Sequence, residues 1–73
     1  MKKEIIEKAL YEAVLLIDIE DKKLKGYLVP NQHFKNKYTL LPLNDYNSSY
    51  TYSASHIKSI QYLRNGVILK WNH

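Results

Sequence analysis

The segment Lys23–Pro30 constrains the fold more than any other stretch of this chain. Polar and apolar residues alternate along it with a period of two, the pattern of a β-strand with one buried face. The predicted inward residues are Leu24, Gly26 and Leu28, and the outward ones are Lys23, Lys25 and Tyr27. A glycine inside a strand lets the backbone bend sharply, because no side chain stands in the way. The strand should end at Pro30, which has no amide hydrogen to donate.

An amphipathic helix is predicted before this strand, over about residues 2–12. Ile5, Ile6, Ala9 and Leu10 recur there at spacings of three and four, which places them on one stripe. From Ala13 the pattern changes to the branched apolar residues typical of strands, so a first strand is predicted over Val14–Glu20. The charged residues that follow should form a turn.

Further strands are predicted over residues 37–44, 50–54, 59–63 and 67–71, separated by turn-forming residues. Residues 55–58 should make a single-turn connection. Asn65-Gly66 is the preferred dipeptide of a two-residue type I′ hairpin, which would pair Arg64 with Val67, Leu63 with Ile68, Tyr62 with Leu69, and Ile60 with Trp71. The loop over residues 31–37 is polar except for Phe34.

One short helix followed by short strands, with no second helix for a parallel crossover, indicates an antiparallel sheet. We therefore predict a mainly β fold with an N-terminal α-helix: a small, strongly bent SH3-like or Sm-like barrel of five to six strands. A chain of 73 residues should form a single domain, residues 1–73, with the helix over about 2–12 and the barrel over about 14–72. So small a core favours oligomerisation as a supplement.

Several classes of protein are disfavoured by what the chain contains. It has no cysteine for a disulfide or a thiolate site, and its longest apolar run, Ala13–Ile17, is far shorter than the roughly 20 residues of a membrane-spanning helix. The histidines do not stand at metal-ligand spacings, and two glycines cannot make a phosphate-binding loop. We predict a cytoplasmic, non-enzymatic protein without metal, cofactor or membrane partner.

With this order of elements, the chain resembles the Sm-like family, and within it the bacterial host-factor (Hfq) type. The resemblance is carried by the segments 23–28, 31–34 and 55–60, together with the N-terminal helix and first strand. It implies an RNA-binding homo-oligomer in which the strand bends at Gly26, Phe34 stacks on a uridine or adenine base, and His56 completes the pocket. The family's loop aspartate falls at Gln32, and the lysine before its pocket histidine falls at Ser55.

The charge balance agrees with nucleic acid as the partner. Eleven Lys and Arg residues oppose seven Asp and Glu residues, and the pI is about 9.3. Exposed aromatic rings stack on unpaired bases while lysines neutralise phosphates. We predict that single-stranded RNA, or another nucleic acid, binds to a set of basic and aromatic residues. The predicted site residues are Lys23, Lys25, Tyr27, His33, Phe34, Lys35, Lys37, His56 and Lys58.

Two alternatives remain open at this point. Phe34 is either a stacking platform or an apolar plug that closes one end of the barrel. The protein itself could instead be a small interaction module, of the phage or mobile-element accessory or inhibitor type, that docks on a host protein. The tyrosine-rich composition, seven residues of 73, favours this second class because tyrosine is enriched at protein interfaces.

Overall fold

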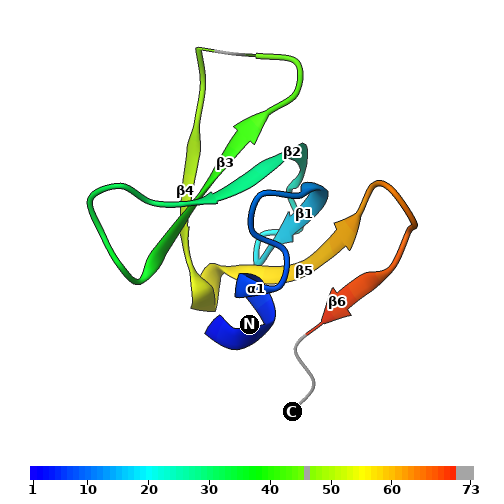
Figure 1. Cartoon of the computed structure of the whole chain (residues 1–73), viewed down its shortest axis with the longest axis horizontal. Helices are drawn as coiled ribbons and strands as arrows, with labels where there is room; N and C mark the ends of the chain where they lie inside the picture. The colour runs from blue at the N-terminus through cyan, green and yellow to red at the C-terminus, as the bar shows by residue number, and fades with distance from the viewer. Residues whose placement is uncertain (46, 71–73) are drawn as a thin grey trace.

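The computed structural model describes residues 1–45 and 47–70, which form one bent antiparallel sheet and a short helix (Figure 1). The elements are α1 (Lys3–Glu7), β1 (Ala13–Asp18), β2 (Lys23–Pro30), β3 (Lys37–Pro42), β4 (Tyr50–Ser53), the single-turn helix η1 (Ala54–His56), β5 (Ile57–Tyr62) and β6 (Ile68–Lys70). The strand order is β4-β3-β2-β1-β5-β6. The predicted mainly β fold with an N-terminal helix is confirmed. No helix in the described ranges is long and apolar enough to cross a membrane.

The sheet bends at Gly26, where β2 passes from one neighbour to the other. Residues 23–27 of β2 pair with β1, whereas residues 26–30 pair with β3. A Cβ atom on Gly26 would overlap the carbonyl oxygen of Leu41, so any other residue would force β2 and β3 apart. Glycine is therefore required here by the close approach of the two backbones.

The core fills the concave side of the bent sheet. The buried apolar side chains are Met1, Ile6, Ala9, Val14, Leu16, Leu28, Tyr38, Leu40, Ile57, Ile60 and Tyr62. They come from both halves of the sheet, from α1 and from the residues on either side of it; α1 lies near η1 and β5 in Figure 1. The predicted alternation of β2 is confirmed, because Gly26 and Leu28 are buried while Lys25 and Tyr27 are exposed.

The helix is shorter than the predicted 2–12. After Glu7 the chain continues in tighter turns, in which the amides of Lys8 and Ala9 bond to carbonyls three residues earlier. Tyr11 then adopts a positive φ of 67°, and its amide donates to the carbonyl of Leu28 in β2. This contact with the sheet ends the helical winding and turns the chain into β1. The apolar stripe was predicted correctly, since Ile6 and Ala9 are fully buried.

The register of the β5–β6 hairpin corrects the predicted one by two residues. Ile60 pairs with Leu69 and Gln61 with Ile68, so the loop contains four residues, 63–66, instead of two. Gly66 has a φ of 74°, and its amide donates to the carbonyl of Tyr62 at 2.9 Å. A shift of two preserves which face each side chain occupies. The predicted pairing of Ile60 with Trp71 falls partly outside the described residues.

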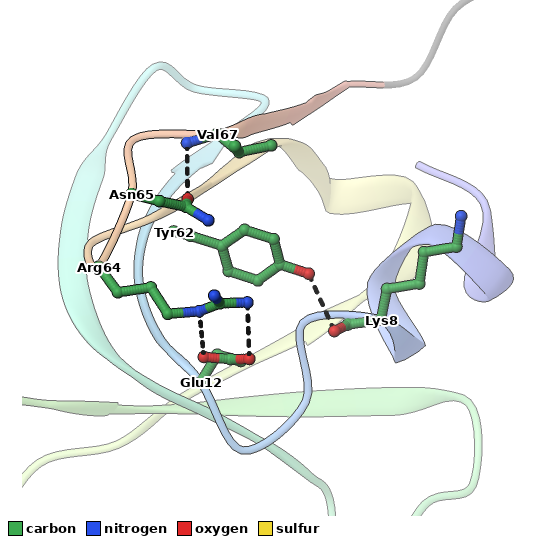
Figure 2. A network of polar contacts seen from close by, with 6 residues as sticks. All are labelled: Lys8, Glu12, Tyr62, Arg64, Asn65 and Val67. Carbon is green, nitrogen blue, oxygen red and sulfur yellow. Dashed lines mark hydrogen bonds and ion pairs between the residues drawn. The ribbon is translucent and has the colours of Figure 1, made fainter.

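Side-chain contacts attach this hairpin loop to the segment that follows α1, as Figure 2 shows. The Tyr62 hydroxyl donates to the Lys8 carbonyl at 2.9 Å, and the Arg64 guanidinium donates to both carboxylate oxygens of Glu12 at 3.2 and 3.4 Å. The Asn65 side-chain oxygen accepts from the amide of Val67 at 2.9 Å. These contacts hold the four-residue loop in its observed conformation.

Candidate functional site

The convex outer face of the sheet carries a row of residues that run side by side across four strands. Lys23 of β2 pairs with Ile17 of β1, Ile17 pairs with Ser59 of β5, and Ser59 pairs with Lys70 of β6. We call these four residues the lysine row. Three strand spacings of about 4.8 Å separate its two lysines, or about 14 Å along the backbone. Their long side chains can therefore reach one group lying between them.

A β-bulge brings a third lysine to this row. Ile17 pairs with Ser59 and Asp18 pairs with Ile57, so Lys58 is an extra residue in β5. Neighbouring residues of a regular strand point to opposite faces. The bulge removes this restriction, and Lys58 and Ser59 both line the same surface hollow.

This hollow has a volume of about 550 Å³ and is lined by Ile17, Asp21, Lys23, Lys58, Ser59 and Lys70. We call it the lysine hollow. Its single carboxylate, Asp21, accepts a bond of 2.6 Å from the Lys58 ammonium. The bond to Lys58, followed by the charges of Lys58 and Lys23, lowers the pKa of Asp21. Two ammonium groups, those of Lys23 and Lys70, have no acidic partner within residues 1–45 and 47–70.

A buried carboxylate holds the turn that carries Asp21. Asp18 is only 6% exposed, and one of its oxygens accepts the amides of Glu20 and Lys22 at 2.9 and 3.0 Å. Its other oxygen accepts the Tyr52 hydroxyl at 3.2 Å. Burial, followed by the charge of Asp18, raises the pKa of Tyr52 to about 12. Asp18 thus fixes the β1–β2 turn against β4 and sets where the lysine row begins.

The opposite end of the outer face is apolar. Leu41 of β3 pairs with Tyr27 of β2, Tyr27 pairs with Ala13 of β1, and the amide of Leu63 donates to the carbonyl of Ala13. We call these four residues the apolar row. Its three large side chains, Leu41, Tyr27 and Leu63, are 42%, 51% and 40% exposed. Lys25 and Leu15 lie between the two rows.

The β2–β3 loop continues this face beyond Tyr27. A second hollow, of about 410 Å³, lies over the outward side of β2 and β3 and includes Val29, His33 and Leu41 in its lining. Asn31 organises the loop, because its side-chain oxygen accepts the amides of His33 and Phe34 at 2.9 Å. The hollow therefore joins the loop to the apolar row.

Phe34 stands at the tip of this loop. Its side chain is 58% exposed, and the Lys37 ammonium lies 4.9 Å from the centre of its ring. A residue this exposed cannot be a plug of the core, so the second of the two alternatives for Phe34 is wrong. The ring is exposed to solvent, with the Lys37 ammonium over one of its faces.

The predicted site residues fall into three groups instead of one pocket. Lys23, Lys25, Tyr27 and Lys58 share the outer face, whereas His33, Phe34 and Lys35 belong to the β2–β3 loop, and Lys37 is the first residue of β3 beside that loop. His56 lies apart in η1, where its Nδ1 is 2.8 Å from the Ser53 hydroxyl and it lines a different hollow with Asp18 and Glu20. His56 and Lys58 therefore line two different hollows.

Lys70 and Ser59 are members of the outer face that were not predicted from the sequence. Lys70 is two positions beyond Ile68. Residues two apart in a strand share a face, and this spacing could have placed both on the outer face. Ser59 pairs with Lys70 in β6. This pairing depends on the hairpin register, and the predicted two-residue turn gives the wrong register.

Comparisons with protein-family models, with curated proteins and with solved structures find no match to this chain.

Proposed function

We propose that this protein is a non-enzymatic module that binds single-stranded nucleic acid, RNA in particular, on the outer face of its sheet. One observation carries the proposal: three lysines converge on the lysine hollow against a single carboxylate, on the same face as Lys25 and the half-exposed ring of Tyr27. Ammonium groups neutralise phosphates, and an exposed ring stacks on an unpaired base. Neither contact depends on the base sequence of the nucleic acid.

The bound nucleic acid follows the outward residues of β2. It begins at the lysine hollow, passes Lys25 and Tyr27, and reaches the β2–β3 loop with Phe34. Unpaired bases suit this path better than a duplex, because the aromatic rings need base faces that a duplex keeps stacked. His56 is left out of the path, since it lies on a different hollow beside two carboxylates.

The bend at Gly26 supports the finer fold proposal, an SH3-like or Sm-like barrel. β4 and β6 are the outermost strands in the sheet order, so each offers one edge for pairing with another copy. We propose a homo-oligomer formed through these edges. The mass of the protein in solution, measured by light scattering during gel filtration, tests this part: a monomer at all concentrations would refute it.

Binding is tested by fluorescence anisotropy with U-rich and A-rich RNA strands between about 50 and 200 mM salt. We expect affinity to fall with salt, and each lysine-to-alanine change at Lys23, Lys58 or Lys70 to reduce the salt slope by about 0.7. Tyr27→Ala should weaken binding by about 1 to 3 kcal/mol with little change in the salt slope.

Lys2→Ala is the matched control, because Lys2 is exposed beside α1, on the covered side of the sheet, and loses the same charge. It should leave the affinity nearly unchanged. If no strand binds at about 50 mM salt, where electrostatic attraction is strong, the proposed function is wrong.

The apolar row supports a second candidate function, docking on a protein. Three large exposed side chains in one row, flanked by lysines, fit a partner surface with an apolar centre and an acidic rim. The double change Leu41→Ser and Leu63→Ser should then abolish capture of a nuclease-resistant partner, while Lys23→Ala and Lys70→Ala only weaken it. The reverse result, in which nuclease removes all captured material, favours nucleic acid.

A further inference from the structure

The lysine hollow lies at one end of the outer face. β1 ends at Asp18 and β2 begins at Lys23, so the lysine row is the last row before the β1–β2 turn. The outward residues of β2 continue from it in one direction only, through Lys25 and Tyr27. A nucleic-acid strand that ends on this path can therefore place its terminal phosphate in the hollow.

The charge in the hollow exceeds what an internal phosphate requires. Three ammonium groups face one carboxylate, which leaves a net charge of +2. An internal phosphodiester carries a single negative charge, whereas a terminal phosphate monoester carries about −1.5 to −2 at pH 7 and offers three acceptor oxygens. Ser59, which lines the hollow and is 9% exposed, adds a hydroxyl as a neutral donor for such a group.

Asp21 already occupies part of the place that an anion would take. Its carboxylate bonds to Lys58 at 2.6 Å, and the two side chains are 71% and 59% exposed. An ion pair this open to water is weak, so a stronger anion can replace the carboxylate on Lys58. The bond marks where an acceptor oxygen sits in the hollow.

We propose, on the basis of the function proposed above, that the lysine hollow binds the terminal phosphate of the nucleic-acid strand and that this phosphate displaces Asp21 from Lys58. Lys23 and Lys70 hold the group from two sides, and Lys58 joins them once it is released. The protein then distinguishes phosphorylated strand ends from hydroxyl ends.

The test compares three RNA strands of identical sequence, with a 5′-phosphate, with a 3′-phosphate, or with hydroxyls at both ends, as unlabelled competitors. We expect one phosphorylated strand to compete about threefold to tenfold better than the hydroxyl strand, the range for a charge-assisted contact that stays open to solvent. Inorganic phosphate is the fourth competitor. If it competes as well as the phosphorylated strand, the hollow is a site for free phosphate and the proposal is wrong.

Variants locate the effect. Lys70→Ala and Lys58→Ala should remove the advantage of the phosphorylated strand, whereas Lys25→Ala, on the same face but outside the hollow, should weaken all strands equally and leave the ratio intact. Asp21→Asn should increase the ratio of the affinity for the phosphorylated strand to that for the hydroxyl strand, because it frees Lys58. Asparagine tolerates the positive φ of 63° at this position, so the turn is kept.

The outcomes separate the two proposals. If all three strands bind with equal affinity, the terminal-phosphate site is refuted and the binding of single strands stands. If no strand binds, both are refuted. An unchanged ratio in Lys70→Ala and Lys58→Ala would place the discrimination elsewhere on the molecule and would also overturn the proposed site.

Discussion

The two faces of strand β2 are made from alternate residues of one segment, yet they are constrained in different ways. The inward face, with Gly26 and Leu28, is fixed by backbone contact and by the core. The outward face, with Lys25 and Tyr27, is exposed to solvent. If the outer face binds nucleic acid as proposed, stability and binding can be changed separately, by residues that are neighbours in sequence.

The largest expected effect is at Gly26. Gly26→Val should destabilise the fold by about 3 kcal/mol or more, because a Cβ would overlap the Leu41 carbonyl and neither backbone can yield cheaply. Urea unfolding followed by circular dichroism measures it. Gly66→Ala is the matched control: it has room for a Cβ but a φ of 74°, so we expect a loss of about 1 kcal/mol. Equal losses would show that the β2–β3 contact does not fix the bend.

Asp18 and Asp21, three residues apart, show the same contrast between a buried residue that holds the fold and an exposed one that does not. Asp18→Ala should cost about 2 to 3 kcal/mol, since three donors that face the buried carboxylate would lose their acceptor. Asp21→Asn should leave the urea midpoint unchanged, because Asp21 is exposed and its backbone conformation suits asparagine. If Asp21→Asn were the more destabilising of the two, the turn would be held by its ion pair.

A smaller effect concerns the pH dependence of stability. The pKa of Tyr52 is about 12 in the folded protein, against 10.0 for an unperturbed tyrosine, so the folded state favours the protonated hydroxyl. Its contribution to stability is complete below pH 10 and is lost as the pH rises towards 12. The urea midpoint of Tyr52→Phe should therefore fall less steeply over this range than that of the unchanged protein. Parallel curves would contradict the raised pKa of Tyr52, which burial and the charge of Asp18 cause.

The smallest effect on stability is expected at Phe34. Phe34→Ala should change the free energy of unfolding by no more than about 0.5 kcal/mol, because the ring is 58% exposed and touches no part of the core. The same variant should weaken RNA binding by about 1 to 3 kcal/mol if the loop supplies a stacking platform. Anisotropy and urea unfolding on one sample measure both. An unfolded variant would place Phe34 among the structural residues.

Part of the candidate site could be predicted because strand alternation is local. Lys23, Lys25 and Tyr27 were assigned to one outward face from a period of two, and the structure has them there. The position of Lys58 could not be assigned in this way, because a bulge interrupts the alternation in β5. Lys70 was missed for a related reason: its neighbour depends on a hairpin loop of four residues, and Asn65-Gly66 favours one of two.

Local patterns and the small size of glycine were enough to predict which residues of β2 face the core, where the sheet must bend, and that the chain is mainly β. The length of α1, the register of β6 and the contact between Lys58 and Asp21 became apparent only in the folded chain. Each depends on a contact between residues far apart in the chain, such as Tyr11 with Leu28, Tyr62 with Lys8, or Lys58 with Asp21. A local pattern fixes the face that a side chain occupies, but not the partner it meets there.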